Sequence, residues 1–120
     1  MFLKMEKYKR PKVLHGETTK IQTGCGNLYI TVNKDGDKPI EVFATLGMAG
    51  GCERCQNEAI TRCITMGLKY GVPIEEFQKQ LFGISCLKPA FGGGKDGKAL
   101  SCADAISKVL KDYVNESTTD

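Results

Sequence analysis

The segment Gly47-Met48-Ala49-Gly50-Gly51-Cys52-Glu53-Arg54-Cys55 marks the point where the chain changes from strand-like to helical patterning. Before it, apolar and polar residues alternate, which is typical of half-buried strands. After it, apolar residues recur at helical spacing as far as about Tyr70, where Gly71 is a stop signal. The segment therefore divides the chain into a β-rich first part and a helical second part.

The β-rich part contains signals for three strands. Residues 13–23 predict a first strand that is interrupted near Gly16, and residues 28–33 and 40–45 alternate in the manner of a hairpin. The turn-forming segment 33–39 joins the last two strands and includes an Asp-Gly step. We expect a hairpin loop longer than two residues there.

The first predicted helix begins at Cys52. Helical spacing places one stripe of small and sulfur-bearing residues on the face that we expect to pack on the sheet: Cys52, Cys55, Ala59, Cys63 and Met66. Cys63 lies between two isoleucines, which favours a buried thiol that packs as a small apolar group.

Two shorter helices follow. The second has Pro73 at its first helical position and Gly83 as its stop. The third begins at Ser101, whose hydroxyl can cap it, with Asp104 three residues later as in a capping box. The order of elements predicts an α+β domain, with a small antiparallel sheet of about three strands followed by three helices packed on one face.

Composition places the chain in the globular class. Its 120 residues suffice for one domain, 41% of them are hydrophobic and 26% are charged. The net charge of +3 owes much to a basic N-terminal segment, 1–12, which we expect to be loosely held, and residues 115–120 form a polar tail. We find no secretory signal and no membrane-spanning apolar run, and expect a cytoplasmic protein that binds no membrane.

Six cysteines are the main chemical signal. Cys25, Cys52, Cys86 and Cys102 occupy turns, loops or predicted helix starts. Unpaired amides at a helix N-terminus stabilise thiolates, which favours Cys52 and Cys102 as ligands or reactive thiols. Four thiolates match the ligand count of zinc or of an iron–sulfur cluster. The four are scattered and show no paired CxxC pattern, so spacing leaves a shared metal site open.

Other features of the sequence bear on different kinds of site. Cys52 and Cys55 form a CxxC at a strand-to-helix junction, the context of a redox dithiol, without the aromatic residue and proline that usually frame one. The segment 92–98 resembles a phosphate-binding loop, but Ala99 replaces the required Ser or Thr and no strand precedes it. His15, the one histidine, fits an ordinary polar position on a strand.

Four stretches carry a family resemblance: Thr23-Gly24-Cys25-Gly26-Asn27-Leu28-Tyr29-Ile30-Thr31-Val32-Asn33; Glu41-Val42-Phe43 with Leu46-Gly47; Gly50-Gly51-Cys52 with Glu58-Ala59-Ile60; and Leu100-Ser101-Cys102-Ala103-Asp104-Ala105-Ile106. In this order they resemble the TSCPD domain, which ends many cobalamin-dependent (class II) ribonucleotide reductases and also occurs as a small free-standing protein. The resemblance covers about residues 13–112, so we assign residues 13–114 to this domain. The chain departs from the signature at Leu100, where threonine is usual, and at Ala103, where proline is usual.

The resemblance implies a metal site formed by Cys25, Cys52, Cys86 and Cys102, with zinc as the simplest metal and an iron–sulfur cluster as the alternative. Cys55 is then an additional thiol. The implied function is a non-catalytic accessory or regulatory module for a ribonucleotide reductase subunit, in DNA precursor synthesis, because 120 residues cannot hold the catalytic barrel.

Two alternatives stay open. One is a thiol redox relay to a reductase, through Cys52 and Cys55 or through Cys86 and Cys102. The other is a small nucleic-acid-binding protein that uses the N-terminal lysines. The oligomeric state is not predicted.

Overall fold

The computed structural model describes residues 6–24, 26–46, 51–85 and 99–114, without the side chains of residues 51 and 52. Three strands precede three helices: β1 (His15–Thr23), β2 (Gly26–Asp35), β3 (Lys38–Leu46), α1 (Gly51–Lys69), α2 (Ile74–Leu81) and α3 (Cys102–Lys111). This order confirms the predicted α+β class. The expected polar tail 115–120 lies outside the described residues.

The sheet is antiparallel, with strand order β1-β2-β3. Two local predictions about it were wrong. β1 runs through Gly16 without interruption, because Gly16 pairs with Asn33 of β2. The hairpin loop is only two residues long, since Asp35 pairs with Lys38, and Gly36 supplies the positive φ of 64° that so tight a turn requires.

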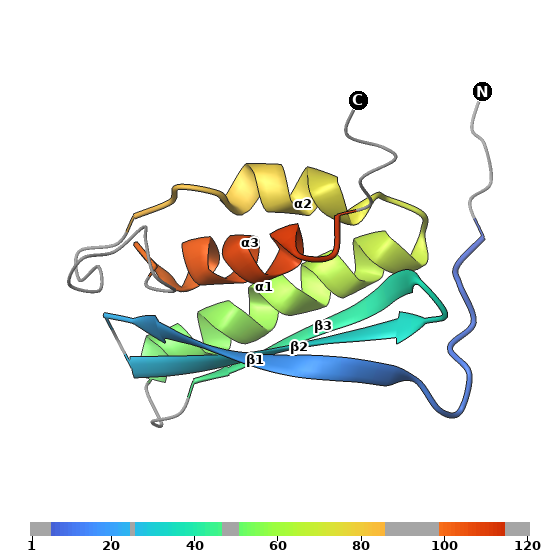
Figure 1. Ribbon diagram of the computed structural model, residues 1–120, viewed down its shortest axis with the longest axis horizontal. Helices are drawn as coiled ribbons and strands as arrows, with labels where there is room; N and C mark the ends of the chain where they lie inside the picture. The colour runs from blue at the N-terminus through green and yellow to red at the C-terminus, as the bar shows by residue number, and fades with distance from the viewer. Residues whose placement is uncertain (1–5, 25, 47–50, 86–98, 115–120) are drawn as a thin grey trace.

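All three helices lie on one side of the sheet, as predicted (Figure 1). α1 follows β3, α3 crosses over β1 and β2, and α2 packs on α3 rather than on the strands. The side chains between these layers form one apolar cluster: Ile21, Leu28, Ile30, Val32, Val42, Leu46, Ile64, Leu68, Ile74, Ala99, Ala105, Ile106, Val109 and Leu110. Burial of this cluster is the main force that joins the sheet to the helices.

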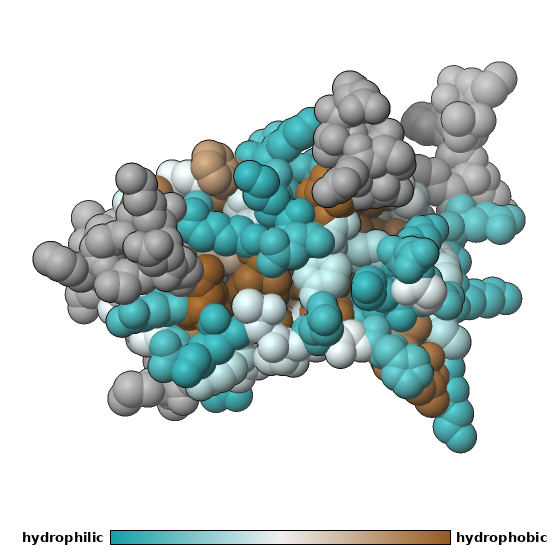
Figure 2. Space-filling view, in the orientation of Figure 1, coloured by the Kyte–Doolittle hydropathy of each residue, from teal (hydrophilic) through white to brown (hydrophobic). Residues whose placement is uncertain are grey.

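The face of the molecule seen in Figure 2 is mostly hydrophilic, with hydrophobic residues in small separate patches. Among the described residues, no helix has both the length and the apolar character needed to span a bilayer. His15 is exposed on β1, as expected of an ordinary polar residue.

The prediction for the buried face of α1 was wrong. The side chains of Cys55, Ala59, Cys63 and Met66 are exposed, whereas the helix buries Asn57, Thr61, Ile64 and Leu68. The physical reason lies in the edge strand β3. Thr65 donates through its hydroxyl to the carbonyl of Val42 (3.1 Å) and accepts from the Val42 N–H (3.0 Å). These two hydrogen bonds and the apolar contacts of Ile64 and Leu68 turn the sulfur-bearing stripe away from the sheet.

The helix ends follow the predicted signals closely. α1 ends before Gly71 and α2 before Gly83, and both glycines have positive φ, at 95° and 80°. Ser101 is the N-cap of α3, as predicted. Pro73 differs slightly, because it is the N-cap of α2 rather than its first helical residue.

The N-terminal segment 6–12, expected to be loosely held, makes specific contacts. Tyr8 donates its backbone N–H to Lys69 of α1 (2.8 Å), and its hydroxyl bonds the carboxylate of Asp35. Arg10 donates to Glu41 on β3 (Nε to Oε2, 2.6 Å). These bonds attach the segment to the sheet and to the end of α1.

Candidate functional site

The described residues next to four of the cysteines lie at one end of the molecule, which we call the cysteine-bearing end. In chain order, Cys25 falls between β1 and β2, and the connection from β3 to α1 leads to Cys52. Cys86 follows the chain that leaves α2, and Cys102 opens α3. In Figure 1 the described residues that flank the cysteines at these four junctions are all at the left, where β1 and β3 end and where α1 and α3 begin. The topology therefore brings the flanks of four distant cysteines together.

Hydrogen bonds hold two of these junctions together. Asp104 is fully buried in the first turn of α3, and its carboxylate accepts from the backbone N–H groups of Gly83 (2.8 Å) and Leu100 (3.0 Å). Ser101 accepts from the Asp104 N–H (3.0 Å) and donates to the carbonyl of Ile84 (2.5 Å). The predicted cap is confirmed, but the acid bonds Gly83 and Leu100, which its position in a capping box did not indicate.

A third junction is attached to the same cluster. The backbone N–H of Ala99 donates to the carbonyl of Gln22 near the end of β1 (3.2 Å). Lys108, one turn along α3, places its ammonium 3.4 Å from the Asp104 carboxylate and partly neutralises it. The chain on both sides of the segment 86–98 is thus fixed against β1 and α3. The glycine-rich stretch 92–98 itself lies outside the described residues.

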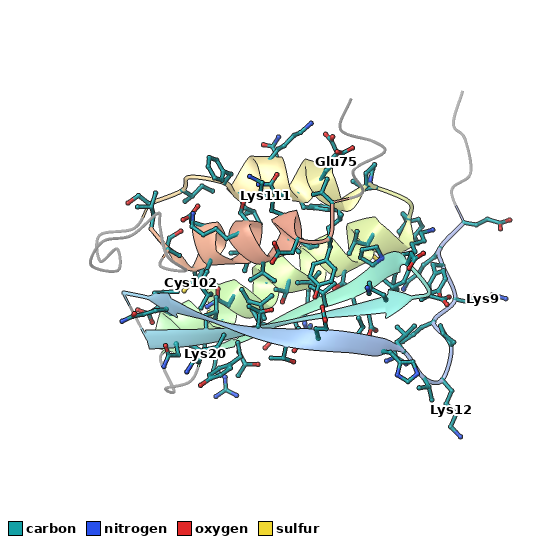
Figure 3. The ribbon with its side chains drawn as sticks, in the orientation of Figure 1. Lys9, Lys12, Lys20, Glu75, Cys102 and Lys111 are labelled. Atoms are coloured by element: carbon teal, nitrogen blue, oxygen red, sulfur yellow. The ribbon has the colours of Figure 1, made fainter. Side chains whose placement is uncertain are left out.

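The four predicted ligands differ in what the structure describes. Cys102 is half-buried at the first position of α3 and packs against the core cluster. Figure 3 shows it between the start of α3 and the sheet. Cys25 and Cys86 lie outside the described residues, as does the side chain of Cys52. Within the described part of the chain, no group of three or more metal-binding side chains is present.

The other two cysteines lie on the exposed side of α1. Cys55 and Cys63 are both exposed, so the prediction of a buried Cys63 was wrong. Cys63 instead lines an apolar groove between α1 and α2, with Ile60, Phe77 and Leu81. The dithiol of Cys52 and Cys55 stays a prediction, because the Cys52 side chain is not described.

Asn57 is a residue that sequence reasoning missed. It lies in the second turn of α1 from the cysteine-bearing end and is only 1% exposed. In the part of the chain that the structure describes, neither its amide oxygen nor its amide nitrogen has a hydrogen-bond partner. Burial of an unpartnered amide costs about 1–3 kcal/mol. The only signal in the sequence was an amide in the apolar phase of a helix.

A second polar cluster lies at the opposite end of the sheet. Tyr113 donates its hydroxyl to Glu17 (2.7 Å), and Lys34 lies over its ring, 5.6 Å from the centroid. Burial, and then the hydrogen bond to Glu17, raise the pKa of Tyr113 to about 12. Tyr113 also lines a cleft beside Asp35, Lys38 and other residues of the adjoining turns. This cluster fastens the end of α3 to β1.

Comparison with known proteins gives the family of the chain. The family model described as the TSCPD domain matches residues 6–114. The chain belongs to the TSCPD domain family. The match begins seven residues before the resemblance predicted from the sequence, and it includes the segment that carries Tyr8 and Arg10.

One curated relative is a "Vitamin B12-dependent ribonucleotide reductase" of Agrobacterium fabrum (strain C58 / ATCC 33970). It is 31% identical to this TSCPD chain over 86 residues, which is 71% of the chain and 7% of the relative. The chain thus spans only a small part of that reductase's length. No solved structure matches the TSCPD chain described here.

Proposed function

We propose that this TSCPD domain is a non-catalytic accessory module of a ribonucleotide reductase, and that its cysteine-bearing end holds a metal ion through Cys25, Cys52, Cys86 and Cys102. The observation that supports the proposal is that the described residues flanking the four cysteines lie at one end of the fold (Figure 1). Similarity to a B12-dependent ribonucleotide reductase supports the choice of partner.

The donor set fits zinc. Four thiolates satisfy the tetrahedral preference of a structural zinc site, and a metal held by four separate junctions would fasten the sheet to the starts of α1 and α3. Within this arrangement, the Asp104 cluster has a positioning role, because it fixes the chain on both sides of Cys86 and at Cys102. An iron–sulfur cluster remains the alternative for the same four thiolates.

The described residues support the proposed accessory role. Their three strands and three helices form one small layered domain whose apolar interior is filled by its own side chains. We infer that the domain stabilises a reductase or modulates it, and does not itself reduce ribonucleotides. Purified protein, supplied with cobalamin, reductant and nucleotide, is expected to form no deoxynucleotide. Turnover by this chain alone would contradict the proposal.

Metal analysis tests the cysteine site directly. The full chain would be purified without oxygen and its zinc and iron measured by inductively coupled plasma mass spectrometry. We expect about one zinc ion per chain. Cys102→Ser should lose most of the metal, whereas Cys63→Ser, the matched control on the exposed side of α1, should retain it. Absence of both metals, with Cys25→Ser leaving the melting temperature unchanged, would overturn the metal site.

Association with a reductase needs a separate experiment. The chain would be mixed with the B12-dependent reductase of the same cell and followed by size-exclusion chromatography. Co-elution that weakens in Cys102→Ser and persists in Cys63→Ser is the expected result. Separate elution of the two proteins at micromolar concentration would remove the reductase as the partner, while leaving the metal result intact.

A further inference from the structure

One face of the sheet is covered by the three helices, and no helix of the described residues lies on the other face (Figure 1). Alternate residues of the three strands form it, and we call this set the open sheet face: Gly16, Thr18, Lys20, Gln22, Asn27, Tyr29, Thr31, Asn33, Glu41, Phe43 and Thr45. Arg10 reaches over one end of it, at Glu41. The remainder carries mainly small polar side chains and two aromatic rings.

The two rings are exposed next to each other. Tyr29 on β2 is 38% exposed and Phe43 on β3 is 49% exposed. Tyr29 pairs with Thr45, so Phe43 is its diagonal neighbour, about 7–8 Å away across an antiparallel pair. Their directly paired neighbours on β2 and β3 are threonines, Thr45 opposite Tyr29 and Thr31 opposite Phe43. Neither ring belongs to the apolar core, so both are available to a ligand.

A positive charge lies beside the rings. Lys20 of β1 pairs with Tyr29, and Figure 3 shows Lys20 below the sheet, on the helix-free side. Lys12 lies at the opposite end of the sheet, before the start of β1, and is not beside the rings (Figure 3).

Within the set that defines the open sheet face, the one carboxylate is Glu41, which Arg10 neutralises at 2.6 Å. The next alternate residue of β2 is Asp35, at the hairpin end of the sheet, where its carboxylate bonds the hydroxyl of Tyr8. An anionic ligand at the rings therefore meets Lys20 and, within this set, one carboxylate that Arg10 neutralises.

A groove continues from the open sheet face around the edge of β3 to α1. Phe43 lines it together with Arg54, Glu58, Arg62 and Met66. Arg62 forms an ion pair with Glu58 (2.7 Å), which leaves the charge of Arg54 in excess. Phe43 thus lies where an aromatic surface meets a cationic groove.

We propose that the open sheet face binds single-stranded nucleic acid, with bases stacked on Tyr29 and Phe43 and phosphates near Lys20 and Arg54. Exposed aromatic rings on a flat sheet take unpaired bases, whose faces are inaccessible inside a duplex. The cations supply the attraction to the phosphates. This inference is independent of the metal and reductase proposals, because it uses neither the cysteines nor the cysteine-bearing end.

Fluorescence anisotropy with a labelled 20-nucleotide oligothymidine and the full chain tests the proposal. We expect Tyr29→Ala and Phe43→Ala each to weaken binding roughly 5- to 150-fold. An increase from 50 to 200 mM salt should weaken it roughly 7-fold for two phosphate contacts. Lys20→Gln should reduce that salt dependence. A duplex of the same length should bind more weakly than the single strand.

Phe82→Ala is the matched control. Phe82 is 60% exposed at the end of α2, in the layer farthest from the sheet, with Lys108 5.6 Å from its ring centroid, so its loss should leave binding unchanged. If circular dichroism shows that an alanine variant does not fold, two milder variants replace the alanine variants. Tyr29→Phe is expected to keep its affinity for the oligonucleotide, and Phe43→Leu is expected to lose affinity. No binding at 50 mM salt, equal binding of the duplex, equal loss in Phe82→Ala, or dimerisation through this face would overturn the proposal.

Discussion

Arg10 and Glu41 form an ion pair across the open sheet face, with Nε and Oε2 2.6 Å apart, and this pair attaches the N-terminal segment to β3. Glu41 is only 4% exposed, and Asn33 donates a second hydrogen bond to it (3.1 Å). Burial acts to raise the pKa of Glu41, but the hydrogen bonds from Arg10 and Asn33 outweigh it and hold the pKa below its ordinary value.

This pair predicts a loss of stability in acid. A carboxyl whose pKa is lowered by folding contributes stability that is fully present above its unfolded pKa of 4.5 and is lost as pH falls through the lower folded value. Thermal unfolding of wild type and Glu41→Gln, followed by circular dichroism between pH 3 and 7, should show a difference near neutrality that shrinks below pH 4.5. A constant difference would contradict this role.

Gly16→Ala should destabilise the sheet by about 1–3 kcal/mol. A methyl group at Gly16 would collide with the backbone of Val32 and Asn33 and with the Asn33 side-chain oxygen. Urea denaturation measures the loss. Lys20→Ala, an exposed change on the same face of β1, is the control and should remain within about 0.5 kcal/mol of wild type. An equal loss in both variants would mean that close packing at Gly16 is not the cause.

Asp104→Ala should cost about 3 kcal/mol, because it leaves the N–H groups of Gly83 and Leu100 without their acceptor and removes the partner of Lys108. Asp112→Ala is the control at the other end of α3. Asp112 is exposed beside the negative end of the helix dipole, so its removal should be neutral or slightly stabilising. Similar melting temperatures for the two variants would contradict the positioning role of Asp104.

Tyr113 should ionise near pH 12, after the ordinary range of tyrosine near 10. Ultraviolet titration of wild type and Tyr113→Phe resolves its step. Since folding raises this pKa, stability should be retained below pH 10 and fall as pH rises toward 12. Glu17→Gln should shift the step to lower pH, because the variant lacks the carboxylate charge that disfavours the phenolate. An unchanged step would exclude Glu17 as a cause.

Asn57→Leu separates a structural role from a functional one. Replacing the buried unpartnered amide with an apolar group of similar volume should raise the free energy of unfolding by about 1 kcal/mol. The paired measurement is the zinc content and the reductase co-elution of the same variant. If the variant is more stable but loses zinc or no longer co-elutes with the reductase, Asn57 belongs to the proposed site. If the variant is less stable, the Asn57 amide has a hydrogen-bond partner in solution.

Much of the domain could be predicted from local patterns. Alternation found β2 and β3, and Gly71, Gly83 and Ser101 marked the helix ends, because these features depend on backbone conformation within a few residues. The hairpin loop and β1 were misjudged where pairing between strands decided the outcome. Asp35 opposite Lys38 and Gly16 opposite Asn33 are relations that no single segment contains.

The phase of α1 shows the same limit at the candidate site. Hydropathy favoured the stripe through Cys55 and Cys63, but the helix turns Thr61, Ile64 and Thr65 toward β3. Sulfur and threonine have similar helical spacing in this segment, so periodicity alone could not choose between the two faces. The N–H and carbonyl groups of Val42 on β3 bond the hydroxyl of Thr65, and these bonds determine which face of α1 packs on the sheet.

The sequence by itself determined the order of the elements and the family, since both depend on local patterns or on short motifs. Only the tertiary structure decided that the junctions beside four of the cysteines meet at one end, that Asp104 holds two of them, and that Tyr29 and Phe43 share an open face. The physical reason is that strand register and helix docking are set by contacts between residues far apart in the chain, and local preferences do not encode those contacts.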